Sequence, residues 1–570
     1  MSQFSRIYNL VPSLLRRRLP RVVISSLCSA VVDLVGIAAL VSVLLVVLDD
    51  NITSSNPLFA WLYQWLGFGS ESAFVTFVCV AVLVLIALKG VVGVALQQYR
   101  SRYMLLLYAD LSKRMYDNYL SRGLLFVRSH HTTRLVNNVN AVCHRFATGV
   151  ISNLLGIFTE LLVVVTLLTL LSFYNPMIVI LAVVVFVPIA LIYSRVIRRR
   201  MAENGREENR LQVAQNKTMY EALRGYADIE IAGAKPSITK RFADGIDSLR
   251  HYSLRASRMR GASGYVIEFS LVLGVVAVIL LGMAWGHSVG TLKLFLGVFA
   301  VAAYRIVPSI NRIMGGWTEY KRNGYVVDLL SEELAVSVPE IPQTTEKLPF
   351  EQSLELKDVS FGYGVGEEAK NVLENFSLLI HKGERVGIQG SSGRGKTTLF
   401  NLLSALFIPA KGELRVDGKA IQSPLQRRQW QNNVAYVSQD LFIPDQTIAE
   451  NIALGVERSK IDPERLQRAI EAARLGDFVA SLPEGVDTVT GEAGCRLSGG
   501  QRQRIGIARA LYKEASVLMF DEATSSLDEQ TEREVVEAVA GISEANRSLT
   551  IVVISHNRKT LEFCDRIITL

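Results

Sequence analysis

Cysteine is rare in this chain, with five residues among 570, and those five are scattered along its length. An odd number of cysteines without paired spacing predicts no disulfide framework and no zinc site. The five are Cys28, Cys79, Cys143, Cys495 and Cys564. A secretory signal peptide is not expected either, because the first apolar run is too long and no small-residue cleavage site follows it.

Charge is sparse in several long stretches before about Met314, although the whole chain has a net charge of +8. Half of the residues are hydrophobic and the mean hydropathy is +0.27, which is high for a soluble protein of this size. A helix needs about 20 apolar residues to cross a bilayer. Six candidate spans lie near residues 21–48, 73–96, 150–173, 177–193, 265–285 and 289–313.

Lysine and arginine are absent between residues 49 and 72 but frequent in the long connections after the second and fourth spans. The positive-inside rule therefore places both termini and both long connections in the cytoplasm. These connections are helical in pattern and predict extensions of the membrane helices. The basic clusters at 16–18 and 198–200 border apolar runs, which favours contact with anionic lipid over nucleic acid. We expect no nucleic-acid partner.

Several charged residues fall within or at the edge of the apolar spans. A charge at the bilayer centre costs at least about 2.5–3.5 kcal/mol on insertion scales, so such residues usually face a polar cavity. The alternative is that they reach an interface or pair with one another, and Lys89 and Arg312 best fit an interfacial position. The candidate cavity residues are Asp33, Lys89, Glu160, Glu268 and Arg305. A short aromatic segment at 56–67 predicts a brief helix in the outer interface or an ordinary aromatic belt.

From about Leu354 the pattern changes to alternating strands, turns and helices, which is typical of an α/β domain. A predicted strand over 385–389 runs into the string G-x-x-x-x-G-K-T, and a helix follows. Backbone N–H groups of such a loop wrap phosphates, while its lysine reaches the β- and γ-phosphates and its threonine binds Mg²⁺. The predicted ATP-binding residues are Gly390, Ser391, Ser392, Gly393, Arg394, Gly395, Lys396, Thr397 and Thr398.

The apolar segment 517–520 predicts a short buried strand, and an acidic pair follows it. Asp521 and Glu522 come directly after it, at the edge of a parallel sheet where phosphates bind. We therefore expect Asp521 to hold Mg²⁺ through water, together with Thr397, and Glu522 to polarise the attacking water.

The segment 497–501, Leu-Ser-Gly-Gly-Gln, resembles the signature of ABC ATPases and precedes the strand ending at Asp521 by about 20 residues. Other motifs of that family match in order over nearly all of 354–570. The resemblance implies ATP and Mg²⁺ as cofactors, with two ATPase domains clamping two nucleotides head to tail. By this resemblance Tyr363 stacks on adenine, Gln439 contacts Mg²⁺ and the water, His556 is the switch histidine, Asp528 lies in the D-loop, and Ser498, Gly499, Gly500 and Gln501 face the partner's nucleotide.

Six spans ahead of one ATPase domain resemble the type IV ABC exporters. The implied fold is multi-domain, with an all-α six-helix transmembrane domain followed by an α/β P-loop nucleotide-binding domain. The expected parts are an elbow helix over 1–20, the transmembrane domain over 21–325, a linker over 326–353 and the ATPase domain over 354–570. Coupling helices are expected near 127–135 and 220–228. A homodimer is favoured, because every motif fits the hydrolytic pattern, and a heterodimer stays open.

Within the exporters, the membrane half resembles the PglK-type flippases of lipid-linked oligosaccharides in the bacterial inner membrane. The likeness rests on the string at 304–312, on the placement of the intramembrane charges, and on the segment at 56–67. It implies membrane lipid and a lipid-linked oligosaccharide or another amphiphile as partners, with Arg305 as the best contact for a pyrophosphate. Gly264 departs from the family's cavity arginine, and Glu160 and Glu268 would disfavour an anion unless paired.

Two other functions stay open. A general exporter of lipids, drugs or peptides would have a more aromatic and less charged cavity. An exporter that processes peptides is disfavoured, because no peptidase-like extension is seen ahead of the first span. A nucleotide-gated channel or sensor fits least, because Glu522 is placed for hydrolysis.

Overall fold

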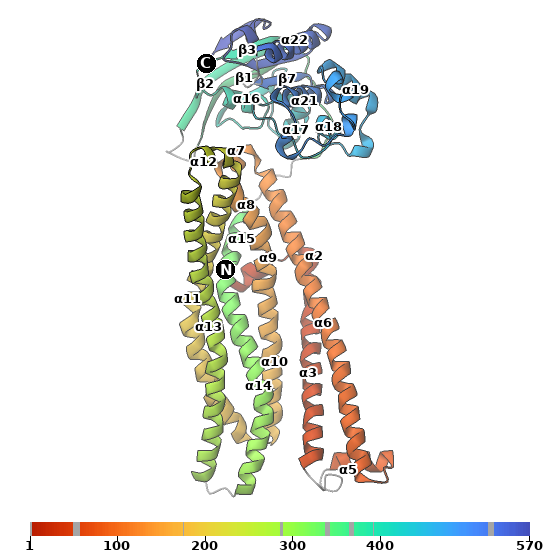
Figure 1. The fold of residues 1–570 in the computed structure, drawn as a ribbon, viewed down its shortest axis with the longest axis vertical. Coiled ribbons are helices and arrows are strands. Elements are labelled where there is room, and N and C mark those ends of the chain that lie inside the picture. Colours follow the sequence, from red (N-terminus) through yellow and green to blue (C-terminus); the bar gives the residue numbers. More distant parts are fainter. Residues whose placement is uncertain are drawn as a thin grey trace. The chain divides into compact units, whose positions relative to one another are not determined.

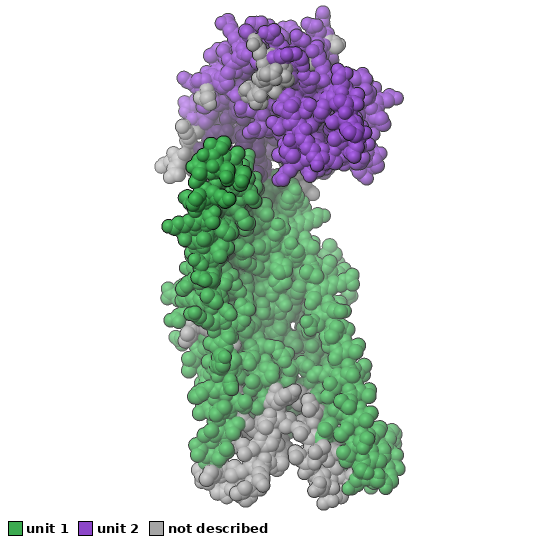
Figure 2. Space-filling model, in the orientation of Figure 1, with its two compact units in different colours: residues 1–120, 129–337 green, residues 121–128, 338–570 purple. Residues whose placement is uncertain are grey.

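The computed structural model describes residues 3–48, 57–174, 176–284, 289–336, 342–363, 370–391, 393–522 and 529–570. The chain divides into two compact units, which Figure 2 shows in different colours. Unit 1 comprises residues 1–120 and 129–337, and unit 2 comprises residues 121–128 and 338–570.

Unit 1 is helical, and several of its long helices run side by side, with α11 (Pro176–Arg224) beside α13 (Lys235–Ala284) (Figure 1). All six predicted spans lie in helices, so the predicted all-α membrane half is confirmed. Its helices are α1 (Gln3–Leu10), α2 (Ser13–Arg16), α3 (Leu19–Leu48), α5 (Pro57–Leu66), α6 (Glu71–Ser121), α8 (Thr132–Asn137), α9 (Cys143–Arg145), α10 (Ser152–Tyr174), α11 (Pro176–Arg224), α12 (Tyr226–Ile231), α13 (Lys235–Ala284), α14 (Val289–Asn323) and α15 (Tyr325–Ala335).

Length separates these helices from ordinary globular ones. The helices α6, α11 and α13 have 51, 49 and 50 residues, so each continues well beyond its apolar span, as the sequence predicts. By length and hydropathy alone, four described stretches could cross a membrane, and Val183–Tyr193 is a shorter apolar helix. The four are Ser13–Gly36, Glu71–Ser121, Thr132–Phe173 and Lys235–Ala277.

Two π-helices lie on the N-terminal side of α10, the helix that contains most of the third span. They are η1 (Asn138–Val142) and η2 (Phe146–Ile151), and the single turn α9 lies between them. The π geometry closes hydrogen bonds from residue i to i+5, so each segment holds one residue more per turn than an α-helix. Arg145, at the end of α9, is therefore set by irregular backbone on both sides.

The short helix α5 has two different faces. Phe59 is buried against Phe74 with an edge-to-face ring contact, which fixes α5 on the start of α6. Trp61 and Trp65 stack with ring centroids 5.7 Å apart, and both are exposed. The predicted brief helix is confirmed.

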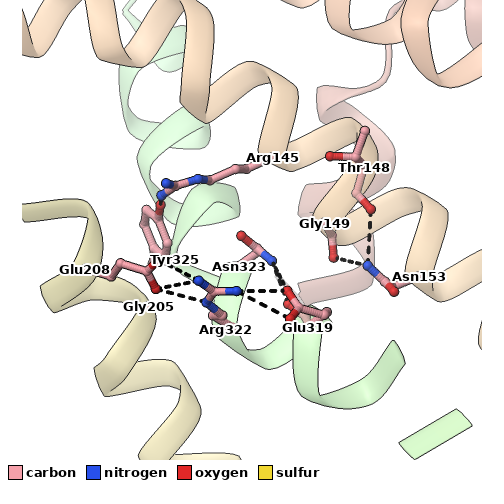
Figure 3. A pocket seen from close by; sticks show the side chains of 10 residues that line it. All are labelled: Arg145, Thr148, Gly149, Asn153, Gly205, Glu208, Glu319, Arg322, Asn323 and Tyr325. Atoms are coloured by element: carbon pink, nitrogen blue, oxygen red, sulfur yellow. Dashed lines mark hydrogen bonds and ion pairs between the residues drawn. The ribbon is translucent and has the colours of Figure 1, made fainter. Parts of the chain in front are cut away.

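A polar cluster joins four helical segments of unit 1 around a cavity of about 260 Å³ (Figure 3). Arg322 of α14 donates three hydrogen bonds to Glu208 of α11, at 2.5 and 2.7 Å from one terminal nitrogen and at 3.0 Å from Nε. Arg145 donates to the Tyr325 hydroxyl of α15 at 2.6 Å and to Gln212 of α11 at 2.5 Å. These charge-assisted bonds join α11 to the ends of α9 and α14 and to the start of α15.

Unit 2 contains two sheets, as expected for the α/β half. An antiparallel sheet has the order β2-β1-β4-β5, and a parallel sheet has the order β6-β7-β8-β3-β9. The strands are β1 (Ser353–Tyr363), β2 (Lys370–His381), β3 (Arg385–Gln389), β4 (Lys411–Val416), β5 (Lys419–Ala420), β6 (Val434–Val437), β7 (Val517–Asp521), β8 (Thr550–Ile554) and β9 (Arg566–Thr569).

Helices cover the parallel sheet, and the hydrophobic core of unit 2 is formed by residues of both. The sheet strands β7 and β8 are buried at every position, which is typical of parallel strands covered on both faces. The helices are α16 (Lys396–Leu403), α17 (Pro424–Asn433), α18 (Ile448–Ile452), α19 (Pro463–Ala472), α20 (Gly476–Ala480), α21 (Gly499–Tyr512) and α22 (Glu529–Ala545).

Unit 2 also includes the short helix α7 (Gly123–Ser129), which begins four residues before the predicted coupling segment at 127–135. Leu124 packs against the hydrophobic core formed around β1, β3 and α16. In unit 1, the short helix α12 overlaps the second predicted segment, and Tyr226 and Ile231 on it are exposed.

The close approach of α11 to α14 generates a stability prediction. A Cβ atom on Gly205 would lie 1.8 Å from the Arg322 carbonyl oxygen, so Gly205→Ala must push the two helices apart. Overpacking of this kind costs about 1–3 kcal/mol, and we expect a lower melting temperature for the detergent-solubilised protein. Gly261→Ala is the matched control, because that glycine of α13 has no atom within 4 Å of its added Cβ. An unchanged melting temperature for Gly205→Ala would contradict the observed contact.

Candidate functional site

The phosphate loop lies between β3 and α16, as the motif predicts. Gly393 and Gly395 have φ of 83° and 91°, a left-handed conformation that favours glycine. A Cβ on Gly395 would also meet the Val372 side chain at 2.8 Å. The Lys396 side chain is only 6% exposed, and its ammonium group donates to the carbonyl oxygens of Gly390 at 2.8 Å and Ser391 at 3.3 Å.

Three strands of the parallel sheet bring the acidic and histidine residues to this loop. The strands β3, β8 and β7 are adjacent, so their carboxyl ends share one edge of the sheet. Glu522, just after β7, lies 3.6 Å from the Lys396 ammonium and 2.8 Å from Nε2 of His556, which follows β8. His556 Nε2 is also 3.1 Å from the Lys396 ammonium. The structure thus joins Lys396, Glu522 and His556 from three separate motifs.

Glu522 has an unusual backbone. Its φ is 49°, in the left-handed region that a glutamate adopts at an energetic cost, and its N–H donates to the Ile554 carbonyl at 3.0 Å. This conformation turns the side chain toward Lys396 and His556. Strained residues of this kind concentrate at active sites, where the surrounding contacts hold them in place.

Asp521 is the last residue of β7 and is 6% exposed. Its Oδ2 accepts a hydrogen bond from the Tyr436 hydroxyl at 3.0 Å. Burial raises the pKa of Asp521, while the side-chain hydrogen bonds to Tyr436 and Thr397 act in the opposite direction. The two predicted Mg²⁺ ligands, Asp521 and Thr397, are therefore in contact. Tyr436 belongs to none of the recognised motifs, although it lies in β6, three residues before Gln439.

These residues fit ATP and Mg²⁺ by their chemistry. Backbone donors and an ammonium group suit phosphates, and a carboxylate, a hydroxyl and an amide oxygen are hard ligands of the kind that Mg²⁺ prefers. Thr397, Asp521 and Gln439 would hold the metal ion. Gln439 is exposed on the loop after β6.

The remaining predicted residues lie around this centre. Tyr363 has an exposed face, and its hydroxyl is 2.9 Å from Oγ1 of Thr398 in α16, so it stands at the phosphate-loop helix. Ser498 caps α21: its hydroxyl accepts from the Gln501 N–H at 3.2 Å, and the Gln501 side chain accepts from the Ser498 N–H at 2.8 Å. The signature therefore presents Gly499 and Gly500 at a helix N-terminus. Ser392 and Asp528 lie outside the described residues.

A second candidate site lies within unit 1. Asp33 of α3 accepts from Arg305 of α14 at 2.7 Å and lies 3.1 Å from the Lys89 ammonium of α6. Glu160 of α10 lies 2.5 Å from Arg312 and 3.8 Å from Arg305. We call these five residues the charge cluster.

The charge cluster borders a cavity of about 610 Å³. Asp33, Glu160, Arg312 and Arg100 line it. Arg305 has an 11% exposed side chain, and its Nε has no hydrogen-bond partner among the described residues.

Four of the five predicted cavity residues belong to the cluster, whereas Glu268 is exposed on α13 and joins none of the ion pairs recorded within the described ranges. Lys89 and Arg312, for which the sequence favours interfacial positions, both pair with carboxylates of the cluster. Ser309 was missed; it donates to Glu160 at 2.7 Å. Its spacing from Arg305 and Arg312, four and three residues, places the three on one helical face.

A helical membrane unit and a separate α/β unit with a phosphate loop, a capped signature helix and a strand ending in Asp-Glu together define an ATP-driven transporter of the ABC class. Two family models match the chain accordingly: the ABC transporter transmembrane region over residues 22–303 and the ABC transporter domain over residues 373–525.

The chain belongs to the ABC transporter family, and it is an ABC ATPase coupled to transport across a membrane. It is 30% identical over 511 residues to an ATP-dependent lipid A-core flippase of Burkholderia pseudomallei (strain 1710b), covering 88% of this chain and 84% of the relative. A protein of the same description from Cupriavidus metallidurans is 34% identical over 502 residues, covering 84% and 81%. A solved structure of a bacterial Atm1-family ABC exporter with ATP bound has a TM-score of 0.77 at 21% identity, covering 98% of this chain and 94% of that chain.

These findings confirm the predicted fold and the ABC exporter assignment. The curated relatives carry the name lipid A-core flippase, so the narrower resemblance to PglK-type flippases is not what the comparisons support.

The contact of Glu522 with Lys396 and His556 generates a catalytic prediction. Replacing Glu522 with Gln keeps the shape of the side chain but removes the carboxylate that would polarise water. We expect ATP hydrolysis to fall by about 10²-fold or more, with ATP binding retained, because general-base catalysis contributes about 10²–10⁴-fold. Phosphate release and nucleotide binding would be measured in parallel. Glu471→Gln, an exposed glutamate of α19, should hydrolyse ATP normally; near-normal hydrolysis by Glu522→Gln would refute the assigned role.

Proposed function

We propose that this chain is one half of a dimeric flippase that uses ATP to move a glycolipid with a phosphate or pyrophosphate headgroup. The charge balance around the cavity of unit 1 carries the proposal. This group of side chains has two carboxylates, Asp33 and Glu160, and four cations, so its net charge is +2 (4 − 2). The cations are Lys89, Arg100, Arg305 and Arg312.

The pairing within the charge cluster answers the objection that acids would repel an anionic headgroup. Glu160 is 8% exposed and is neutralised by Arg312 and Arg305, with Ser309 as a further donor. Asp33 is shared by Arg305 and Lys89. Arg305 retains an unused donor, Nε, as far as the described residues show, so it can donate to one more anionic oxygen.

The relatives support a lipid as the cargo, because those reported are called lipid A-core flippases. Lipid A and a polyprenyl-pyrophosphate oligosaccharide share the chemistry that this cavity would recognise, namely sugars, phosphate groups and long apolar chains. The headgroup would occupy the charged cavity, while the chains stay in the bilayer. A lipid-linked oligosaccharide is the first candidate from the sequence, and a lipid A-core molecule is the candidate from the relatives.

ATP would drive this movement through two copies of unit 2. Lys396 and the N–H groups of the phosphate loop would bind the phosphates, Tyr363 would stack on adenine, and Glu522 with His556 would orient the attacking water. Ser498 and the glycines at the N-terminus of α21 suit the γ-phosphate of a nucleotide held by a second copy. We place the chain in the bacterial inner membrane with unit 2 in the cytoplasm.

The decisive experiment is translocation in proteoliposomes with two labelled cargoes, a polyprenyl-pyrophosphate oligosaccharide and a lipid A-core molecule. Transport would be followed by access of an external enzyme to the headgroup, with Glu522→Gln as the inactive reference. ATP-dependent movement of one cargo identifies it. Hydrolysis without movement of either cargo would overturn the flippase proposal and favour a general exporter.

The charge cluster adds a prediction for specificity. Arg305→Gln removes a buried cation and leaves Asp33 and Glu160 with fewer partners, so we expect transport of the phosphorylated lipid to fall by at least about tenfold. Basal ATP hydrolysis should change little, because the substitution lies in unit 1. Arg199→Gln is the control, since its side chain is 90% exposed and its ion pair with Glu203 lies at the surface. Equal transport by both variants would show that Arg305 does not contribute to substrate recognition.

A further inference from the structure

Tyr436 lies beside Asp521, the carboxylate that we assign to the metal ion, although Tyr436 belongs to no recognised motif. The strand β6 pairs with β7 in parallel, with Tyr436 opposite Met519, two residues before Asp521. The Tyr436 hydroxyl donates to Oδ2 of Asp521 at 3.0 Å. The Tyr436 hydroxyl therefore holds Asp521 from β6, in addition to the hydrogen bond with Thr397.

The ring of Tyr436 is also held by packing against another aromatic side chain. It makes an edge-to-face contact with Phe400 of α16, with ring centroids 6.2 Å apart and an interplanar angle of 70°. Phe400 is fully buried and lies four residues after Lys396 in the helix that begins at the phosphate loop. A displacement of α16 or β6 therefore moves the phenol relative to Asp521.

The helix α7 belongs to the same unit and reaches the same core. Leu124 packs against the cluster of buried residues that contains Phe400, and Tyr436 packs against that cluster as well. Tyr436 and α7 thus contact the same buried cluster, while the Tyr436 hydroxyl holds Asp521.

We propose that Tyr436 is a positioning residue, which fixes the Asp521 carboxylate for Mg²⁺ and relays the position of α7 to it. The inference rests on the proposed role of Asp521 as a metal ligand. Residues that hydrogen-bond to metal ligands fix the ligand's orientation, and their loss typically costs about 10–100-fold in metal affinity. A purely structural role, in which the phenol only satisfies a buried carboxylate, predicts a loss of stability without a specific loss of metal affinity.

The test uses the full-length protein in lipid nanodiscs, in the Glu522→Gln background to prevent turnover. Mn²⁺ serves as the probe, and its binding in the presence of ATP is measured by electron paramagnetic resonance. For Tyr436→Phe we expect the Mn²⁺ dissociation constant to rise about tenfold, with ATP affinity in EDTA unchanged. Tyr512→Phe is the control, because it removes another hydroxyl of unit 2, the one that accepts from the Asp462 N–H at 3.1 Å.

Each outcome is decisive. Unchanged Mn²⁺ affinity in a folded Tyr436→Phe protein, judged by its melting temperature, overturns the proposal. If Phe does not fold, Tyr436→Leu removes the same hydroxyl and is measured instead. Asp521→Asn separates the two levels of inference: if it also leaves Mn²⁺ affinity unchanged, the assigned metal site is wrong, whereas a loss confined to Asp521→Asn refutes only the role of Tyr436.

The relay from α7 is tested by a double-mutant cycle. Leu124→Ala should weaken Mn²⁺ binding by about twofold or more when Tyr436 is present and have no effect in the Tyr436→Phe background, as coupled residues behave. Leu125→Ala is the matched control, because Leu125 of the same helix is exposed. Additive effects of Leu124→Ala and Tyr436→Phe would exclude the relay.

Discussion

A buried charge must find an opposite charge or several hydrogen-bond partners, and both units of this protein are organised around that requirement. In unit 2, Lys396 is almost fully buried and is compensated by two carbonyl oxygens and Glu522. In unit 1, Glu160 is compensated by arginines of α14. In each unit the compensating groups come from segments far apart in the sequence, so satisfying the charge also assembles the site.

The two sites differ in how readily they could be predicted from sequence. The residues of unit 2 follow strand ends, and parallel strands end at a common edge, so Gly390, Asp521 and His556 could be brought together without coordinates. The contact of Glu522 with His556 follows from the same rule. Tyr436 could not be found this way, because its role depends on which strand neighbours β7, and sequence order does not determine sheet order.

The ion pairs of the charge cluster in unit 1 could not be predicted from the sequence, for a related reason. Apolar spans can be recognised one at a time, but no local pattern says that α3 and α6 both bring a charge to α14. The residues Lys89 and Arg312 therefore looked interfacial when each was considered on its own helix. The spacing of Arg305, Ser309 and Arg312 showed a polar face, and only the packing of α10 against α14 revealed that Glu160 is its partner.

The two π-helices on either side of α9 have a consequence for how this region tolerates changes of length. Each accommodates a residue that a regular helix would not, so deleting one residue from η1 or η2 could be absorbed by a return to α-helical pitch. The residues beyond the deletion would then keep their orientation, because the residue removed is the extra one held by the π-turn. Arg145 would keep its bonds to Tyr325 and Gln212. The same deletion in the regular helix α10 would turn everything beyond it by about 100° about the helix axis.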